Sequence, residues 1–151
     1  MSTDSNQRGR SAVLVAVLLP ILLIPVAAWY ALGRPTSSQV PPGEADYMVE
    51  PPPIPAWAEH GAGILALALL VASAAVLYRS RASVRLPEGV ALALFVVAGL
   101  IAGGTARIVT APGTGANIGG GLAVLFGLPF AGLLLVTGVV LVVVSVVRSR
   151  H

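Results

Sequence analysis

Long apolar runs alternate with short polar segments along the 151-residue chain. A helix needs roughly 20 apolar residues to cross a hydrocarbon core about 30 Å thick. One charged residue at mid-membrane costs about 2.5 to 3.5 kcal/mol on the insertion scale, so runs without charge are strong candidates for spans. Four such runs are present, at 12–32, 61–78, 89–106 and 118–147.

The pattern predicts an all-α membrane protein, a bundle of four transmembrane helices with antiparallel neighbours and a proline-rich extracytoplasmic loop. Pro55 and Pro87 suit the first turns of the second and third helices, and Glu59 and Glu88 follow near the positive helix ends. The predicted segments are a tail at 1–11, a helix at 12–32, the Pro-rich loop at 33–54, a helix at 55–79, an Arg-rich loop at 80–86, a helix at 87–107, a Gly-rich turn at 108–117, a helix at 118–147 and a tail at 148–151.

The arginines predict the orientation of these helices. Seven of them fall in the segments that share a side with the N-terminus, and Arg34 and Arg107 fall on the other side. Basic residues accumulate on the cytoplasmic side of membrane proteins. Both termini are therefore predicted to be cytoplasmic, in the inner or plasma membrane. The seven are Arg8, Arg10, Arg79, Arg81, Arg85, Arg148 and Arg150.

The first apolar run has an alternative interpretation as a secretory signal peptide cut after Ala28. The run is longer than the core of a typical signal peptide, and it contains Pro20 and Pro25. These features favour a retained, kinked helix.

Composition narrows the functional classes further. The chain is 56% hydrophobic and 10% charged, with a mean hydropathy of +0.91, and its basic residues are all Arg. These arginines lie between apolar runs and not on a soluble face, so we expect the lipid bilayer and no nucleic acid as a partner. With no cysteine there is no disulfide or thiolate site. Such composition is typical of a bacterial, high-GC genome.

Asp, Glu, Lys, Arg and His are missing from the four runs themselves. A proton relay, a coupled cation transporter or a membrane-embedded haem would need one or more of them at membrane depth. We therefore assign no cofactor, metal or catalytic residue.

The predicted outer face carries the candidate contact residues Asp46, Glu50, Glu59, His60 and Arg107. Carboxylates and an imidazole could bind a metal or perform acid–base chemistry. However, adjacent residues of a helix point to different faces, and no metal-ligand spacing occurs. The preferred interpretation is a solvated loop and a helix cap, with contacts to an external partner as the alternative.

Small residues recur at four-residue spacing in the last two runs, where they let helix backbones approach closely in lipid. We interpret them as packing positions within the chain, with self-association or docking on another membrane protein as the alternative. They are Gly99, Gly103, Ala123, Gly127 and Ala131.

The fourth run is too long for a simple perpendicular span, because 30 helical residues extend about 45 Å. The preferred solution is a continuous helix that is tilted or kinked at Pro129. The alternative places a re-entrant piece at 119–127, which would indicate a pore or binding cleft.

A glycine-rich stretch, TAPGTGANIGGG at 110–121, precedes this run. It lacks the last glycine of a dinucleotide fingerprint and the Lys-Ser/Thr pair of a phosphate loop. Exposed N–H groups beside Arg107 could hold an external anion. A turn between the third and fourth helices is the preferred interpretation.

Three functions remain compatible with the sequence. The preferred one is a non-enzymatic structural or accessory subunit that binds another membrane protein or a second copy of itself. An oligomeric transport or pore element, lined by backbone, Ser73, Thr105 and Thr137, is the first alternative. A membrane enzyme with an outer acidic and histidine site is the second.

Overall fold

The computed structural model describes residues 2–33, 47–81, 84–112 and 118–148, and within these ranges it has helices and no strands. One π-helical turn interrupts the α-helical structure. The elements are α1 (Ser2–Leu18), α2 (Pro20–Ala31), α3 (Ala56–Arg79), α4 (Leu86–Val109), α5 (Ile118–Leu122), the π-helical turn η3 (Ala123–Gly127) and α6 (Leu128–Arg148).

Four helical segments are long and apolar enough to cross a membrane, which confirms the all-α, four-span prediction. The helix that contains the first segment, α1, begins at Ser2, so residues 2–11 of the expected tail are helical. Of the predicted Pro-rich loop, 34–46 lies outside the described residues. The four segments are Gly9–Ala31, Ala56–Arg79, Leu86–Val109 and Ile118–Arg148.

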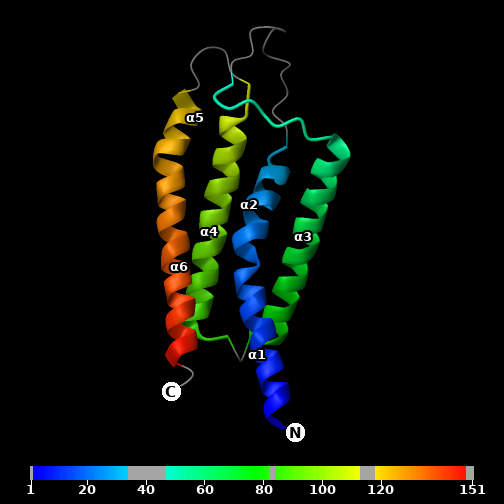
Figure 1. The fold of residues 1–151 in the computed structure, drawn as a ribbon, viewed down its shortest axis with the longest axis vertical. Helices are drawn as coiled ribbons and strands as arrows, with labels where there is room; N and C mark the ends of the chain where they lie inside the picture. The colour runs from blue at the N-terminus through cyan, green and yellow to red at the C-terminus, as the bar shows by residue number, and fades with distance from the viewer. Residues whose placement is uncertain (1, 34–46, 82–83, 113–117, 149–151) are drawn as a thin grey trace.

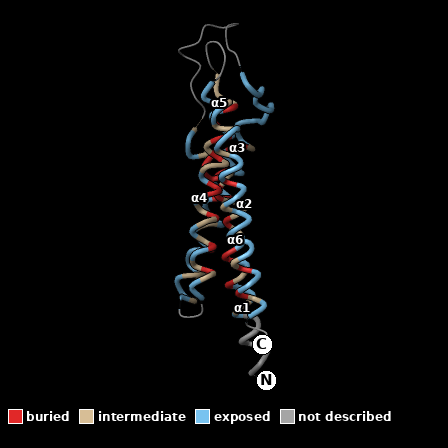
Figure 2. Tube along the Cα trace, turned by 90° about the vertical axis from the view of Figure 1, so that its left-hand side faces the viewer, coloured by how far each residue is buried: buried red, intermediate tan, exposed pale blue. Residues whose placement is uncertain are grey.

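The helices form a single layer (Figure 1). Their order across the layer is α6, α4, α2 and α3, and the view turned by 90° shows how thin the layer is (Figure 2). In the contacts between elements, α4 packs on both α2 and α6, whereas α3 packs on α1 and α2. The two edge helices therefore leave most of their circumference uncovered.

This order corrects the expectation that all packed neighbours are antiparallel. The central helices α2 and α4 run in the same direction, while α3 and α4, which follow one another in the chain, lie on opposite sides of α2. Hydropathy alone could not reveal this order, because each span is apolar around its whole circumference. Small residues on α4 make the parallel contact with α2 close, as described below.

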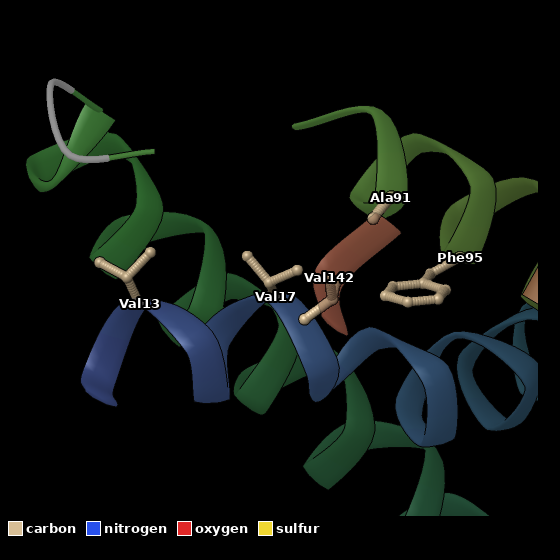
Figure 3. Close-up of a cluster of buried hydrophobic side chains, with 5 residues drawn as sticks. All are labelled: Val13, Val17, Ala91, Phe95 and Val142. Carbon is tan, nitrogen blue, oxygen red and sulfur yellow. The ribbon is translucent and has the colours of Figure 1, made fainter. Parts of the chain in front are cut away.

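The apolar core lies toward the end of the layer that holds both termini, here called the terminal end; the opposite end is the loop end. Figure 3 shows the core side chains converging from α1, α4 and α6. Phe95 is its largest member and is 1% exposed. The cluster consists of Val13, Val17, Ala91, Phe95 and Val142.

Candidate functional site

A buried ion pair joins α3 and α4 at the loop end. The Arg107 Nη2 atom donates to Glu59 Oε1 at 3.1 Å, and the two side chains are 9% and 7% exposed. The Arg107 guanidinium also lies over the Trp29 ring of α2, with its carbon 4.5 Å from the ring centroid. Three helices therefore meet at this one cation.

The expectation that Glu59 is a solvated outer group is wrong, and the external-contact candidate Arg107 pairs with it. Both are buried, because α2 places an aromatic ring beside the last turn of α4 and the first turn of α3. A charge removed from water is stable only when it is paired, and each side chain supplies the partner of the other. Arg107 is thus engaged with Glu59, and residues 113–117 of the glycine-rich stretch beside it lie outside the described residues.

The other candidates of the outer face remain separate from this pair. Glu50 and His60 are exposed, and Asp46 lies outside the described residues. The His60 ring meets Tyr30 edge to face, with 5.8 Å between centroids. The Tyr30 ring also occupies the position that a side chain at Gly63 would need, so α2 and α3 approach closely at this end.

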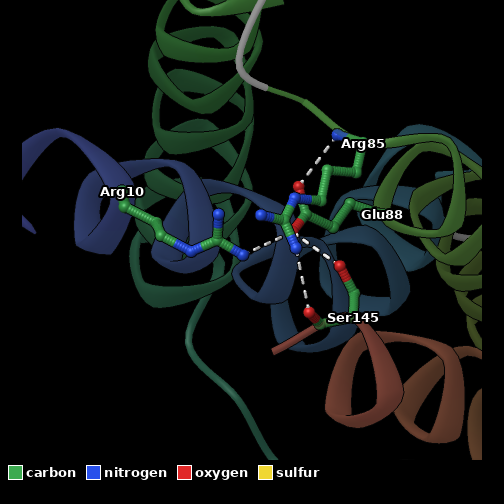
Figure 4. A network of polar contacts seen from close by, with 4 residues as sticks. All are labelled: Arg10, Arg85, Glu88 and Ser145. Atoms are coloured by element: carbon green, nitrogen blue, oxygen red, sulfur yellow. Dashed lines mark hydrogen bonds and ion pairs between the residues drawn. The ribbon is translucent and has the colours of Figure 1, made fainter. Parts of the chain in front are cut away.

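A second polar cluster lies at the terminal end (Figure 4). The Glu88 carboxylate is 2% exposed and accepts hydrogen bonds from the Arg85 backbone N–H at 3.1 Å and the Ser145 hydroxyl at 3.0 Å. Arg10 Nη2 lies 3.5 Å from the same carboxylate. Arg85 Nη1 donates to the Ser145 carbonyl at 3.2 Å.

This terminal cluster, defined as Arg10, Arg85, Glu88 and Ser145, connects α1, α4 and α6. The sequence placed Glu88 at a helix start, and the structure shows it at the third position of α4 in a capping box with Arg85. Its links to α1 and α6 were missed. The Ser145 carbonyl belongs to the last turn of α6, where carbonyls lack a helical partner, and Arg85 supplies one.

The small residues of α4 face α2. A methyl group at Gly99 would stand 2.6 Å from Ile24 Cγ2, and one at Gly103 would collide with the Pro25 carbonyl oxygen and stand 2.8 Å from Ala28 Cβ. Both glycines are buried. They therefore set the distance between the two central helices.

The small residues of the fourth span contribute less evenly. Ala131 is buried, whereas Ala123 and Gly127 are half-buried. A methyl group at Gly127 would stand 2.8 Å from Thr105 Oγ1, which places that hydroxyl against the glycine. Gly138 was not singled out from the sequence, yet the buried Phe95 ring fills the space above it.

The overlong fourth segment is helical from Ile118 to Arg148, as the preferred interpretation expected. Its irregularity differs from the expected one, since the π-helical turn at Ala123–Gly127 precedes Pro129. Pro129 has no N–H and would crowd the carbonyl four residues earlier in a regular helix. A wider turn immediately before the proline accommodates that geometry.

The buried charged side chains that the structure describes therefore act between helices. Within the described ranges, no group of three or more His, Cys, Asp or Glu side chains is arranged to hold a metal ion. Ser73 and Thr137 donate to carbonyls of their own helices, those of Leu69 and Leu133. Comparisons with family models, curated proteins and solved structures found no match for this chain.

Proposed function

We propose that this chain is a non-enzymatic membrane protein that acts as a structural or accessory subunit. It binds another membrane protein along an edge of the helix layer, and both of its termini lie in the cytoplasm. The single-layer arrangement carries the proposal. Helices α3 and α6 are each packed on one side only, and the spans they provide are largely uncovered. Small residues are frequent on the uncovered face of α3, which permits a close approach of a further helix.

The polar groups support the same function. The carboxylates of Glu59 and Glu88 are both buried and engaged with arginines, so the chain's buried charges tie helices together. An acid or base would need access to a substrate. We therefore do not propose a membrane enzyme with an acidic and histidine site on the outer face.

The test uses bulky substitutions at the two edges. Ala68 on α3 is exposed, and a side chain at Gly132 on α6 would meet no atom within 4 Å. We expect Ala68→Trp or Gly132→Trp to abolish stoichiometric co-purification with one defined membrane protein from native membranes. Neither change should lower the thermal stability of the purified chain, since neither enters a packed contact.

Retention of the same partner by both variants would refute the edge-docking proposal. A chain that purifies alone and conducts solutes in liposomes would instead support the transport alternative. One observation favours that alternative: π-helical turns are frequent at functional sites, and η3 lies beside the buried hydroxyl of Thr105.

A further inference from the structure

The terminal cluster contains more positive than negative charge. Glu88 is its one carboxylate, and the guanidiniums of Arg10 and Arg85 both belong to it. Two cations against one anion give a formal charge of +1. Arg85 directs its Nη1 to the Ser145 carbonyl, so among the described side chains Arg10 forms the ion pair with Glu88, and at 3.5 Å that pair is long.

Arg10 has unused hydrogen-bonding capacity. Its Nη2 atom is buried and faces Glu88, whereas its side chain as a whole is 35% exposed. A guanidinium carries five N–H donors in a planar fork. One side of the fork therefore faces Glu88, and the rest is open to an acceptor from outside the helix layer.

Further arginines lie at the same end of the layer as Arg10. Helix α1 packs on α3, whose end carries Arg79 and is followed by Arg81, the latter 5.2 Å from the centroid of the Tyr78 ring. Glu88 is the one carboxylate at this end whose side chain is described. An anion that approaches Arg10 is thus attracted by several positive charges at this end of the layer.

The depth of the cluster identifies the class of anion. Arg10 is the second residue of the apolar span Gly9–Ala31, and Arg85 directly precedes the span Leu86–Val109. This level corresponds to the headgroups of a bilayer, just outside the hydrocarbon core. Guanidinium forks bind phosphate oxygens through paired, charge-assisted hydrogen bonds.

We propose that the Arg10 guanidinium, together with the positive field of Arg85 and the end of α3, binds the phosphate group of an anionic phospholipid. The lipid source is favoured over free phosphate, because the apolar flanks of the spans begin directly beyond the cluster and can contact acyl chains. The bound phosphate accepts hydrogen bonds from the exposed part of the Arg10 side chain, whereas Nη2 stays buried against Glu88. The site is independent of any protein partner.

The test measures the binding of single lipid molecules to the full chain in a neutral detergent by native mass spectrometry. The probes are phosphatidylglycerol, phosphatidylcholine and inorganic phosphate. We expect phosphatidylglycerol to be retained in preference to phosphatidylcholine. Arg10→Gln should weaken that retention about fivefold, the factor equivalent to about 1 kcal/mol for one basic residue at an anionic surface.

Arg148→Gln is the matched control. Arg148 is exposed at the same end of the layer and takes no part in the terminal cluster, so its loss lowers the net charge equally and should leave retention unchanged. Should Arg10→Gln fail to fold, Arg10→Lys preserves the charge beside Glu88 but not the fork, and it should still weaken retention. Equal retention of the two lipids, or equal losses for Arg10→Gln and Arg148→Gln, would overturn the proposal. Competition by millimolar phosphate would overturn the lipid assignment.

Discussion

Replacing Gly103 by alanine tests how the two central helices are held together. The added methyl group would collide with the Pro25 carbonyl oxygen, stand 2.8 Å from Ala28 Cβ and stand 3.1 Å from the Trp29 backbone nitrogen. Two of these three atoms belong to the backbone of α2, so no side-chain rotation relieves the overlap. Carbon atoms prefer about 3.5 to 4.0 Å, and α4 must therefore move from α2 by roughly 1 Å.

The magnitude follows from two opposing effects. Overpacking of a close contact costs about 1 to 3 kcal/mol. Exchange of glycine for alanine in a helix returns about 0.5 to 1 kcal/mol. We expect Gly103→Ala to lower the free energy of unfolding by about 1 to 2 kcal/mol, measured by reversible unfolding in mixed micelles.

The next residue supplies the control. An added methyl group at Gly104 would meet only Leu32 Cδ1, at 4.0 Å, so Gly104→Ala should keep the gain in helix propensity without the clash. It should be neutral or stabilising by up to about 1 kcal/mol. If the two variants are equally stable, α2 and α4 are not in the close contact described.

Two further changes test the polar clusters at the ends of the layer. Ser145→Ala should destabilise the chain by about 1 kcal/mol, because it removes a hydrogen bond to the buried Glu88 carboxylate. Ser73→Ala removes only a hydrogen bond within its own helix and should be near neutral in the same thermal unfolding assay. Glu59→Gln should lower the free energy of unfolding by about 3 kcal/mol, because it leaves the Arg107 cation buried and unpaired. The double variant with Arg107→Gln should recover part of this stability. A double-mutant cycle that shows no coupling between the two residues would contradict the pairing.

The sequence predicted the spans well, because their lengths and lack of charge are local properties. It also placed Glu88 at a helix start, since proline and an acidic residue mark a helix N-terminus. The spacing of Gly99 and Gly103 indicated close packing, but it did not identify the partner helix. Gly138 has no small residue four positions away that marks it, so its contact with Phe95 is visible only in three dimensions.

The pairing of Glu59 with Arg107 was not predictable by the same reasoning. Each residue lies at the end of a different helix, 48 positions apart in the chain, and each alone is compatible with solvent. Their burial depends on the order of helices in the layer, because α2 brings Trp29 between the ends of α3 and α4. The contact of Arg10 with Glu88 was unpredictable for a similar reason. The usual excess of arginine on one side of a membrane already accounts for the arginines at the terminal end, so their number does not indicate that Arg10 reaches Glu88.

The buried charged groups at the two ends of α4 have a consequence for the membrane around the protein. On α4, Glu88 and Arg107 are engaged at opposite ends, 19 positions apart, which corresponds to about 28 Å of helix. That length is close to the hydrocarbon thickness of an ordinary bilayer. In a markedly thicker bilayer we expect one polar tie to approach the hydrocarbon unless the bilayer thins locally, so the chain should favour lipids of one range of chain lengths.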